Sequence, residues 1–211
     1  MESWGSDPSI GFVSTYPPTI CGLANFTASL LGAISENRGA GDRLGVVALA
    51  DSGSTVPVGD VLYRHGRGNQ DSLDVAIKHL NAFDVVSIQH EFGIFGGTDG
   101  DEAVEIAAAL KVPAVVTFHT VLNHPSDHQR AIVERLALIT ARSVVMSRTA
   151  LHRLTGTDGR LAARMERHTR RLKRGRYWPS IGQRYDRLMS TVAFGDRSAA
   201  NHPIGIHRVA G

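Results

Sequence analysis

Short, continuous apolar runs alternate with segments of helical periodicity through most of this chain. The predicted strands are Ile10–Val13, Leu44–Ala50, Val58–Tyr63, Asp84–Gln89, Ala114–Phe118 and Ser143–Met146. The predicted helices are Gly22–Asn37, Asn69–Asn81, Asp101–Leu110, Ser126–Thr140 and one that begins at Thr149–Leu154. Apolar runs without polar alternation are typical of strands buried on both faces. The pattern therefore predicts an α/β fold, with a mostly parallel sheet covered by helices on both faces.

The pattern also divides the 211 residues into parts. We expect a disordered N-terminus (1–9), a Rossmann-like domain (10–154), a linker (155–160), C-terminal helices that pack on the domain (161–192) and a flexible tail (193–211). Residues 1–9 lack the basic and apolar regions of a secretory signal. There is no apolar run of about 18 residues that would span a membrane. The single cysteine, Cys21, suits a reducing compartment. We therefore expect a cytoplasmic protein.

The positive charge of the chain is local. Residues 160–176 contain eight Lys or Arg side chains and one acid, Glu166, whereas the net charge of the whole chain is only +3. A basic surface spread over the fold, as nucleic-acid binding requires, is not expected. Two interpretations of Arg160–Arg176 remain open: a solvated helix, or a helix that binds the anionic inner face of a membrane.

Polar and glycine-rich segments follow the predicted strands. They are Ser14–Gly22, His90–Gly97, His119–His124 and Ser147. Ligands of parallel α/β sheets bind beyond the carboxyl ends of the strands. The sequence therefore predicts a binding cleft at that edge.

The first of these segments ends at Gly22, where a helix is predicted to begin. A glycine there lets a ligand approach the backbone, and the helix N-terminus attracts phosphate. A simple strand–helix turn remains the alternative. The segment does not have the GxGxxG spacing of dinucleotide-binding proteins. Cys21 is either a thiol activated by the helix end or a small packed residue.

The second segment, His90–Gly97, contains His90-Glu91 but not HExxH, because Ile94 occupies the position of the second histidine. A zinc protease site is therefore not expected. Gly93, Gly96 and Gly97 allow the loop to fold tightly over a ligand. Two roles remain open for Phe92 and Phe95: packing beneath the loop, or stacking on a sugar.

The third segment places His119 at the end of a strand, where it can donate a hydrogen bond into the cleft. His124 and His128 lie four positions apart, which is a spacing that metal ligands use. Pro125 lies between them, and no cysteine or carboxylate completes an obvious set. We therefore predict no metal site.

Together, four segments resemble the N-terminal, acceptor-side domain of glycosyltransferase family 4, a family with the two-domain GT-B fold. They are STYPPTICGLANF (14–26), SIQHEFGIFGG (87–97), VVTFHTVL (115–122) and VVMS (144–147). Their order and their positions after successive strands match that domain. The resemblance covers about Ile10 to Leu154, and HEFGIFGG is its most specific part.

The resemblance implies metal-independent transfer of a hexose, such as mannose or glucose, from a nucleotide-sugar to a carbohydrate or lipid-linked acceptor, with retention and with no cofactor. It implies that His119 contacts the donor sugar as the catalytic residue. The implied donor and phosphate contacts are Gly22, Cys21 and Ser147. The implied acceptor contacts are Tyr16, His90, Glu91, Phe92, Gly93, Gly96, Gly97 and Thr120.

One part of the family pattern does not occur in this sequence. The family's second domain supplies a basic pair and a Glu-x7-Glu motif, whereas here Leu161–Val192 resembles the family's terminal helices, with WPSIGQRY (178–185) as the segment that crosses back. We therefore expect weak or no transfer by the chain alone. The alternatives are a non-catalytic binding remnant that associates with a protein partner or itself through the exposed side of the cleft, and a peripheral membrane module.

Overall fold

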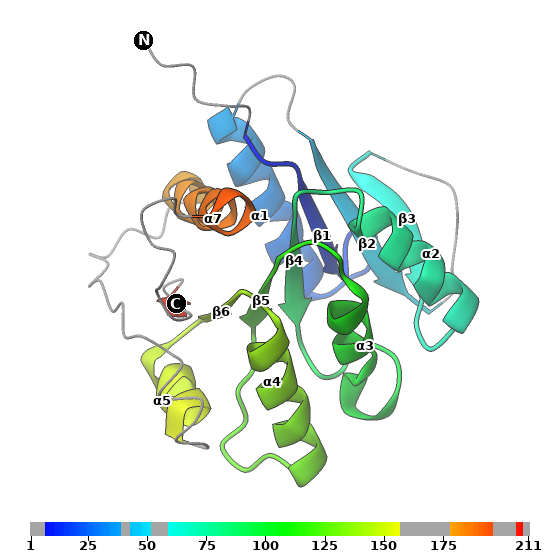
Figure 1. The fold of residues 1–211 in the computed structure, drawn as a ribbon, viewed down its shortest axis with the longest axis vertical. Helices are drawn as coiled ribbons and strands as arrows, with labels where there is room; N and C mark the ends of the chain where they lie inside the picture. The colour runs from blue at the N-terminus through cyan, green and yellow to red at the C-terminus, as the bar shows by residue number, and fades with distance from the viewer. Residues whose placement is uncertain (1–6, 39–42, 52–58, 157–177, 196–205, 209–211) are drawn as a thin grey trace.

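The computed structural model describes residues 7–38, 43–51, 59–156, 178–195 and 206–208. Its strands form one sheet in the order β3-β2-β1-β4-β5-β6-β7, and all neighbouring strands are parallel (Figure 1). The strands are β1 (Ile10–Ser14), β2 (Leu44–Ala50), β3 (Val61–Gly66), β4 (Val85–His90), β5 (Ala114–Phe118), β6 (Arg142–Val145) and β7 (Ile206–Arg208). The α-helices are α1 (Gly22–Arg38), α2 (Gln70–Leu80), α3 (Glu102–Ala109), α4 (Asp127–Ile139), α5 (Arg148–Gly156) and α7 (Trp178–Phe194), and a short 3₁₀ helix spans Thr98–Gly100.

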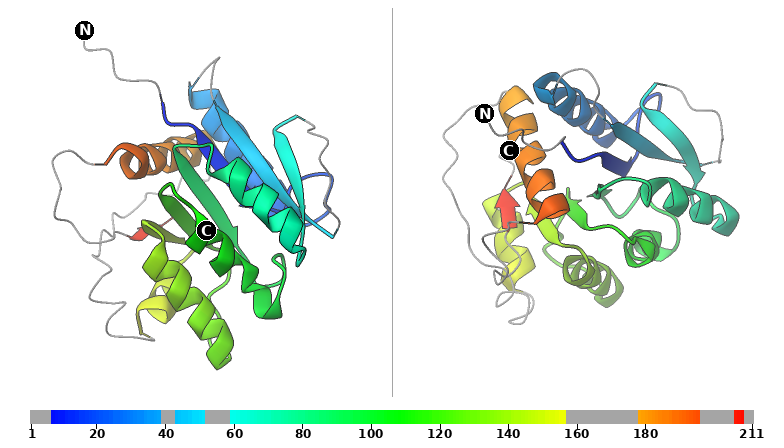
Figure 2. Two further views of the ribbon diagram at one scale, coloured as in Figure 1. Left: turned by 45° about the vertical axis from the view of Figure 1, so that its right-hand side comes forward. Right: turned by 45° about the horizontal axis from the view of Figure 1, so that its top comes forward.

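Helices cover both faces of this sheet (Figures 1 and 2). α1 and α7 pack on one face, through a cluster that includes Leu30, Ile34 and Met189. α2, α3, α4 and α5 pack on the other, through a cluster that includes Leu80, Ile106 and Leu136. Side chains that alternate along a strand enter different clusters, as expected for strands buried on both faces. The predicted α/β class, with a parallel sheet between helices, is confirmed.

Local sequence signals account for where two of the helices begin. Asn69 caps α2, because its side chain accepts a hydrogen bond from the backbone N–H of Ser72 at 2.9 Å. Ser126 and Gln129 form a reciprocal capping box at the start of α4. Such caps satisfy N–H groups that have no partner within the helix and contribute about 1 kcal/mol each.

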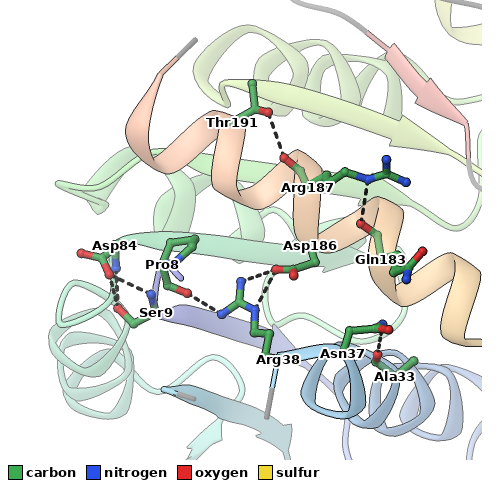
Figure 3. A network of polar contacts seen from close by, with 10 residues as sticks. All are labelled: Pro8, Ser9, Ala33, Asn37, Arg38, Asp84, Gln183, Asp186, Arg187 and Thr191. Atoms are coloured by element: carbon green, nitrogen blue, oxygen red, sulfur yellow. Dashed lines mark hydrogen bonds and ion pairs between the residues drawn. The ribbon is translucent and has the colours of Figure 1, made fainter. Parts of the chain in front are cut away.

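The helix α7 is joined to α1 by close packing and by a buried ion pair. A Cβ atom on Gly182 would lie 2.4 Å from the carbonyl oxygen of Ala33, so the two backbones nearly touch. The Arg38 guanidinium pairs with Asp186 and also donates to the carbonyl oxygen of Pro8 at 2.6 Å (Figure 3). Only 1% of the Arg38 side chain is exposed. These contacts connect the two helices to the chain segment that enters β1.

The observed boundaries differ from several predicted ones. β3 lies at Val61–Gly66 rather than at 58–63, and its pairing with β2 has an irregularity in register between Val46 and Val47. α5 continues to Gly156, two residues into the predicted linker 155–160. β7 lies within the predicted tail 193–211 and hydrogen-bonds to β6. A three-residue strand at one side of a sheet has too little pattern to be found from sequence.

Two further sequence predictions concern the N-terminal residues 1–9 and the basic segment 160–176. Within the predicted disordered segment 1–9, Ser9 is buried, and its backbone N–H and hydroxyl donate to the Asp84 carboxylate at 2.8 and 2.6 Å (Figure 3). These two bonds hold the pKa of Asp84 below its usual value. The basic segment Arg160–Arg176 lies outside the described residues.

Candidate functional site

A cavity of about 410 Å³ lies where β1, β4 and β5 end. In the sheet, β2 lies on one side of β1 and β4 lies on the other side. The strand order therefore reverses at β1. Ligands of open α/β sheets bind at such switch points. The cavity is lined by Cys21, Gly22, Leu23, Phe26, Glu91, Ile94 and His119. Four of these, Cys21, Gly22, Glu91 and His119, are residues that the sequence predicted.

The N-terminus of α1 forms one wall of the cavity. Cys21 caps this helix: its sulfur accepts from the backbone N–H of Ala24 at 3.3 Å and lies 3.2 Å from the Thr15 hydroxyl oxygen. Gly22 and Leu23 follow in the first turn, where backbone N–H groups have no partner inside the helix. A Cβ atom on Gly22 would meet nothing within 4 Å. The space beside Gly22 is therefore open to a ligand.

Glu91 supplies a carboxylate to the opposite wall. One carboxylate oxygen accepts a hydrogen bond from the Thr120 hydroxyl, and the other accepts from the backbone N–H of Phe92 at 3.1 Å. Thr120 thus contributes indirectly, by fixing Glu91. A carboxylate offers about four lone-pair sites, so Glu91 can still accept hydrogen bonds from ligand hydroxyls.

His119 completes the polar part of the lining. Its Nε2 lies 2.9 Å from the amide oxygen of Gln89, a fully buried residue of β4. The Phe26 ring meets the His119 ring edge-on, with centroids 4.8 Å apart, and Trp178 packs on Phe26 in turn. Burial lowers the pKa of His119 to about 4. The imidazole is therefore neutral at neutral pH and can act as a hydrogen-bond donor and acceptor.

His90, which was expected to contact the acceptor, lies in the core instead. Its side chain is completely buried between the rings of Phe92, Phe95 and Phe118. Among the described residues, neither of its ring nitrogens has a hydrogen-bond partner. Burial and the neighbouring His119 lower the pKa of His90 to about 4. The alternation of β4 explains the correction, because His90 is the last strand residue and points to the α3 side.

The glycine-rich loop after β4 is held by a buried carboxylate that the sequence analysis did not single out. Glu102 accepts hydrogen bonds from the backbone N–H groups of Gly96 and Gly68, each at 2.8 Å. Its other contact is His65, whose Nε2 lies 3.0 Å away. A Cβ atom on Gly96 would lie 2.4 Å from the Gly68 nitrogen, so the two loops touch. Gly96 therefore serves loop packing, whereas Gly93 and Gly97 are exposed.

The two aromatic residues of this loop pack beneath it. Phe95 is 5% exposed and belongs to the core on the α2–α5 side, and Phe92 is partly buried against the same cluster. Neither residue is among those that line the cavity. Of the two roles left open by the sequence, the structure favours packing over sugar stacking for both.

Two further predicted residues lie away from the cavity lining. The Tyr16 hydroxyl donates to Asp60 at 2.9 Å, and burial together with this bond raises the pKa of Tyr16. The Ser147 hydroxyl accepts from the backbone N–H of Ala150 at 3.1 Å and so caps α5. Both residues follow strands of the sheet, as predicted, but their observed bonds are structural.

Four residues that matter to the site were missed by the sequence analysis: Leu23, Phe26 and Ile94 in the lining and Gln89 behind it. Gln89 had a signal, because Ser87 and Gln89 place two polar side chains on one face of an otherwise apolar strand. The lining residues had none, because an apolar side chain beside a cavity looks the same in sequence as one in the core.

In the described ranges, no three His, Cys, Asp or Glu side chains come together as a metal site would require. None of the helices described is both long and apolar enough to cross a membrane. A scan against protein-family models and a search of curated proteins found no match for this chain.

Proposed function

We propose that this chain is a glycosyltransferase-like protein that binds a sugar in the cavity beside α1, with a nucleotide-sugar as donor and a carbohydrate or lipid-linked molecule as acceptor. The observation that carries the proposal is the lining of the cavity. Three segments that resemble glycosyltransferase family 4 contribute Gly22, Glu91 and His119 to it. These segments are far apart in sequence. The resemblance of each segment, taken singly, does not require that the three segments meet at one cavity.

The chemistry of the lining suits a hexose. The Glu91 carboxylate can accept hydrogen bonds from hydroxyl groups, and so can the unprotonated nitrogen of the neutral His119 ring. Leu23, Phe26 and Ile94 offer apolar surface to the C–H faces of a sugar ring. Because a carboxylate repels phosphate, we assign the sugar to the side with Glu91 and the diphosphate to the first turn of α1.

Transfer is expected to be slow or absent for the chain alone. The departing nucleoside diphosphate must be stabilised in the transition state, and preorganised charges usually provide this. The sequence contains no Glu-x7-Glu motif, which the family uses for the nucleotide and the sugar. Hexose release from a nucleotide-sugar by the purified chain at a rate typical of enzymes would contradict this part of the proposal.

Binding is tested by calorimetric titration of the full chain with UDP-glucose, GDP-mannose and the free hexoses. Gly22→Ala adds a methyl group to the open space of the cavity, so we expect an affinity at least about ten-fold weaker than that of the wild type. Gly32→Ala is the matched control, since it lies on the same helix and its Cβ would also meet nothing within 4 Å. Absence of wild-type binding to every ligand, or equal binding by both variants, would refute the sugar site.

One observation favours a second candidate, a non-catalytic interaction module. Ile20 is fully exposed directly before the cavity residues Cys21 and Gly22, and Trp178 is 36% exposed next to Phe26. Exposed apolar side chains beside a cavity are common at protein interfaces. This candidate predicts concentration-dependent self-association in light scattering that Ile20→Ser reduces. A monomer at all concentrations would exclude self-association.

A further inference from the structure

A chain of hydrogen bonds runs from α7 to the cavity. The Tyr185 hydroxyl on α7 lies 3.1 Å from the amide nitrogen of Gln89 on β4. The amide oxygen of Gln89 lies 2.9 Å from Nε2 of His119 in the cavity. Tyr185 is 2% exposed and Gln89 is completely buried. Tyr185 is thus connected through one intermediate, Gln89, to the cavity residue His119.

The proton positions in this chain follow from the chemistry of the groups. An amide oxygen only accepts hydrogen bonds, so Nε2 of His119 carries the proton that it donates to Gln89. His119 is neutral at neutral pH, because burial lowers its pKa to about 4. A neutral imidazole has one proton, so Nδ1 is the unprotonated nitrogen and the acceptor of the ring.

The amide of Gln89 could in principle rotate by half a turn, which would exchange its oxygen and nitrogen. In the observed orientation, the two amide hydrogens have two acceptors, the Ser87 hydroxyl at 2.7 Å and the Tyr185 hydroxyl at 3.1 Å. In the rotated orientation, one amide hydrogen would face Nε2 of His119 and the other would lose its acceptor. A buried donor without a partner is unfavourable, so the observed orientation is preferred.

Tyr185 is needed for this preference. Its hydroxyl is fixed by further contacts with the Ser87 hydroxyl at 2.7 Å and the Thr117 hydroxyl at 3.1 Å. Without the Tyr185 hydroxyl, the observed orientation would also leave one amide hydrogen unpaired. The two orientations would then be nearly equal in energy, and each would select a different tautomer of His119.

We propose that Tyr185 is a positioning residue that acts through Gln89 to hold His119 as its Nε2–H tautomer, so that Nδ1 is available to accept a hydrogen bond from a ligand hydroxyl. The tautomer is independent of any ligand, whereas its use by a sugar hydroxyl rests on the proposed function. The C-terminal helix would therefore contribute to the site without touching the ligand.

The test is long-range ¹H–¹⁵N NMR of the histidine rings in the labelled full chain, at neutral pH and without ligand. His119 is assigned by the loss of its signals in His119→Asn. We expect the wild type to show Nε2–H for His119, and Tyr185→Phe to raise the Nδ1–H share to about half. Tyr63→Phe is the control, because it removes another buried tyrosine hydroxyl, which lies 2.9 Å from Ser72 on the other face. It should leave His119 unchanged.

Two results would overturn the proposal: an Nδ1–H tautomer in the wild type, or an unchanged tautomer ratio in a folded Tyr185→Phe variant. If that variant does not fold, Ser87→Ala gives the same test, because it also leaves one amide hydrogen of Gln89 without an acceptor. If sugars bind, Tyr185→Phe should weaken binding about two-fold, since only half of the molecules present Nδ1. Failure of all sugar binding would refute the proposed function and leave the tautomer result standing.

Discussion

Glu102 is the residue on which the glycine-rich loop most depends. Burial alone would raise the pKa of this carboxyl, but the nearby His65 ring, 3.0 Å away, and the hydrogen bonds from the backbone N–H groups of Gly96 and Gly68 hold the pKa below its usual value. His65 is itself fixed by the Ser72 hydroxyl, 3.0 Å from its Nδ1. A buried carboxylate with this many donors is a satisfied group rather than a reactive one. Glu102 holds the loop after β4 against the loop after β3, because it accepts a hydrogen bond from each loop.

Gly97 is a point in this loop where no other residue fits. Its φ of 79° and ψ of −170° lie in a region that is essentially restricted to glycine. A Cβ atom there would also lie 1.8 Å from a carboxylate oxygen of Asp101. We therefore expect Gly97→Ala to lower the free energy of unfolding by about 2 kcal/mol or more.

Urea denaturation measures this change, with Gly93→Ala as the control. Gly93 belongs to the same loop, and its Cβ would meet nothing within 4 Å. Equal stability of the two variants would show that Gly97 is not constrained as described.

Residue types alone predicted part of this site. Glycines after a strand indicated a tight loop, and a histidine at a strand end indicated a cleft residue, whereas Glu91 was expected only from the family resemblance. Gly22, Glu91 and His119 line the cavity. His90 could not be distinguished from its neighbour Glu91 in this way. Which of two adjacent residues faces the cavity depends on the exact residue at which β4 ends, and sequence patterns leave that residue uncertain by a few positions.

At the scale of elements, the close contact between α1 and α7 depends on one small residue. Gly182 allows the α7 backbone to approach the Ala33 carbonyl group, and this approach brings Tyr185 within reach of β4 and β5. An alanine in the interior of a helix is normally about 1 kcal/mol more favourable than a glycine. Here the added methyl group would force the two helices apart.

We expect Gly182→Ala to lower the melting temperature, with a loss of about 1–3 kcal/mol in the free energy of unfolding. Gly32→Ala, on α1, has open space for its methyl group and should be neutral or stabilising. Thermal unfolding followed by circular dichroism compares the two. A stabilised Gly182→Ala variant would mean that α7 tolerates a looser contact.

The elements themselves were largely predictable, because long apolar runs and helical periodicity reflect burial directly. The packing of α7 against the sheet, in contrast, was not predictable from the sequence. Tyr185 occupies an apolar position of its helix, and only the three-dimensional arrangement sets its hydroxyl beside Ser87, Gln89 and Thr117. Contacts between residues 68 to 98 positions apart leave no periodic signal in one sequence.

At the scale of the whole molecule, one buried and one partly buried histidine make stability depend on pH. The pKa of both His90 and His119 is lowered to about 4, whereas a histidine in an unfolded chain has a pKa of about 6.5. Between these values the unfolded chain binds protons that the folded chain does not. The free energy of unfolding therefore falls as the pH falls from about 6.5 to about 4.

We expect His90 to contribute up to about 3 kcal/mol to this loss, and His119 less because it is partly exposed. His90→Phe should flatten the pH dependence, because Phe cannot be protonated. It should also raise stability at pH 7 by about 1 kcal/mol, because the buried ring nitrogens have no partner among the described residues. Urea denaturation from pH 7.5 to 4.5 measures both effects. A wild-type stability that stays constant over this range would refute the assignment.

The packing of α7 on α1 also has a consequence for synthesis. A ribosome adds about 5–20 residues per second, so the interval between the emergence of Arg38 and that of Phe194 is on the order of ten seconds. During that interval Phe26 and Ala33 on α1 lack Trp178 and Gly182, the α7 residues that pack on them in the finished fold. The nascent chain therefore carries an uncovered apolar surface that a holdase chaperone would bind, and it loses that surface only when α7 has emerged.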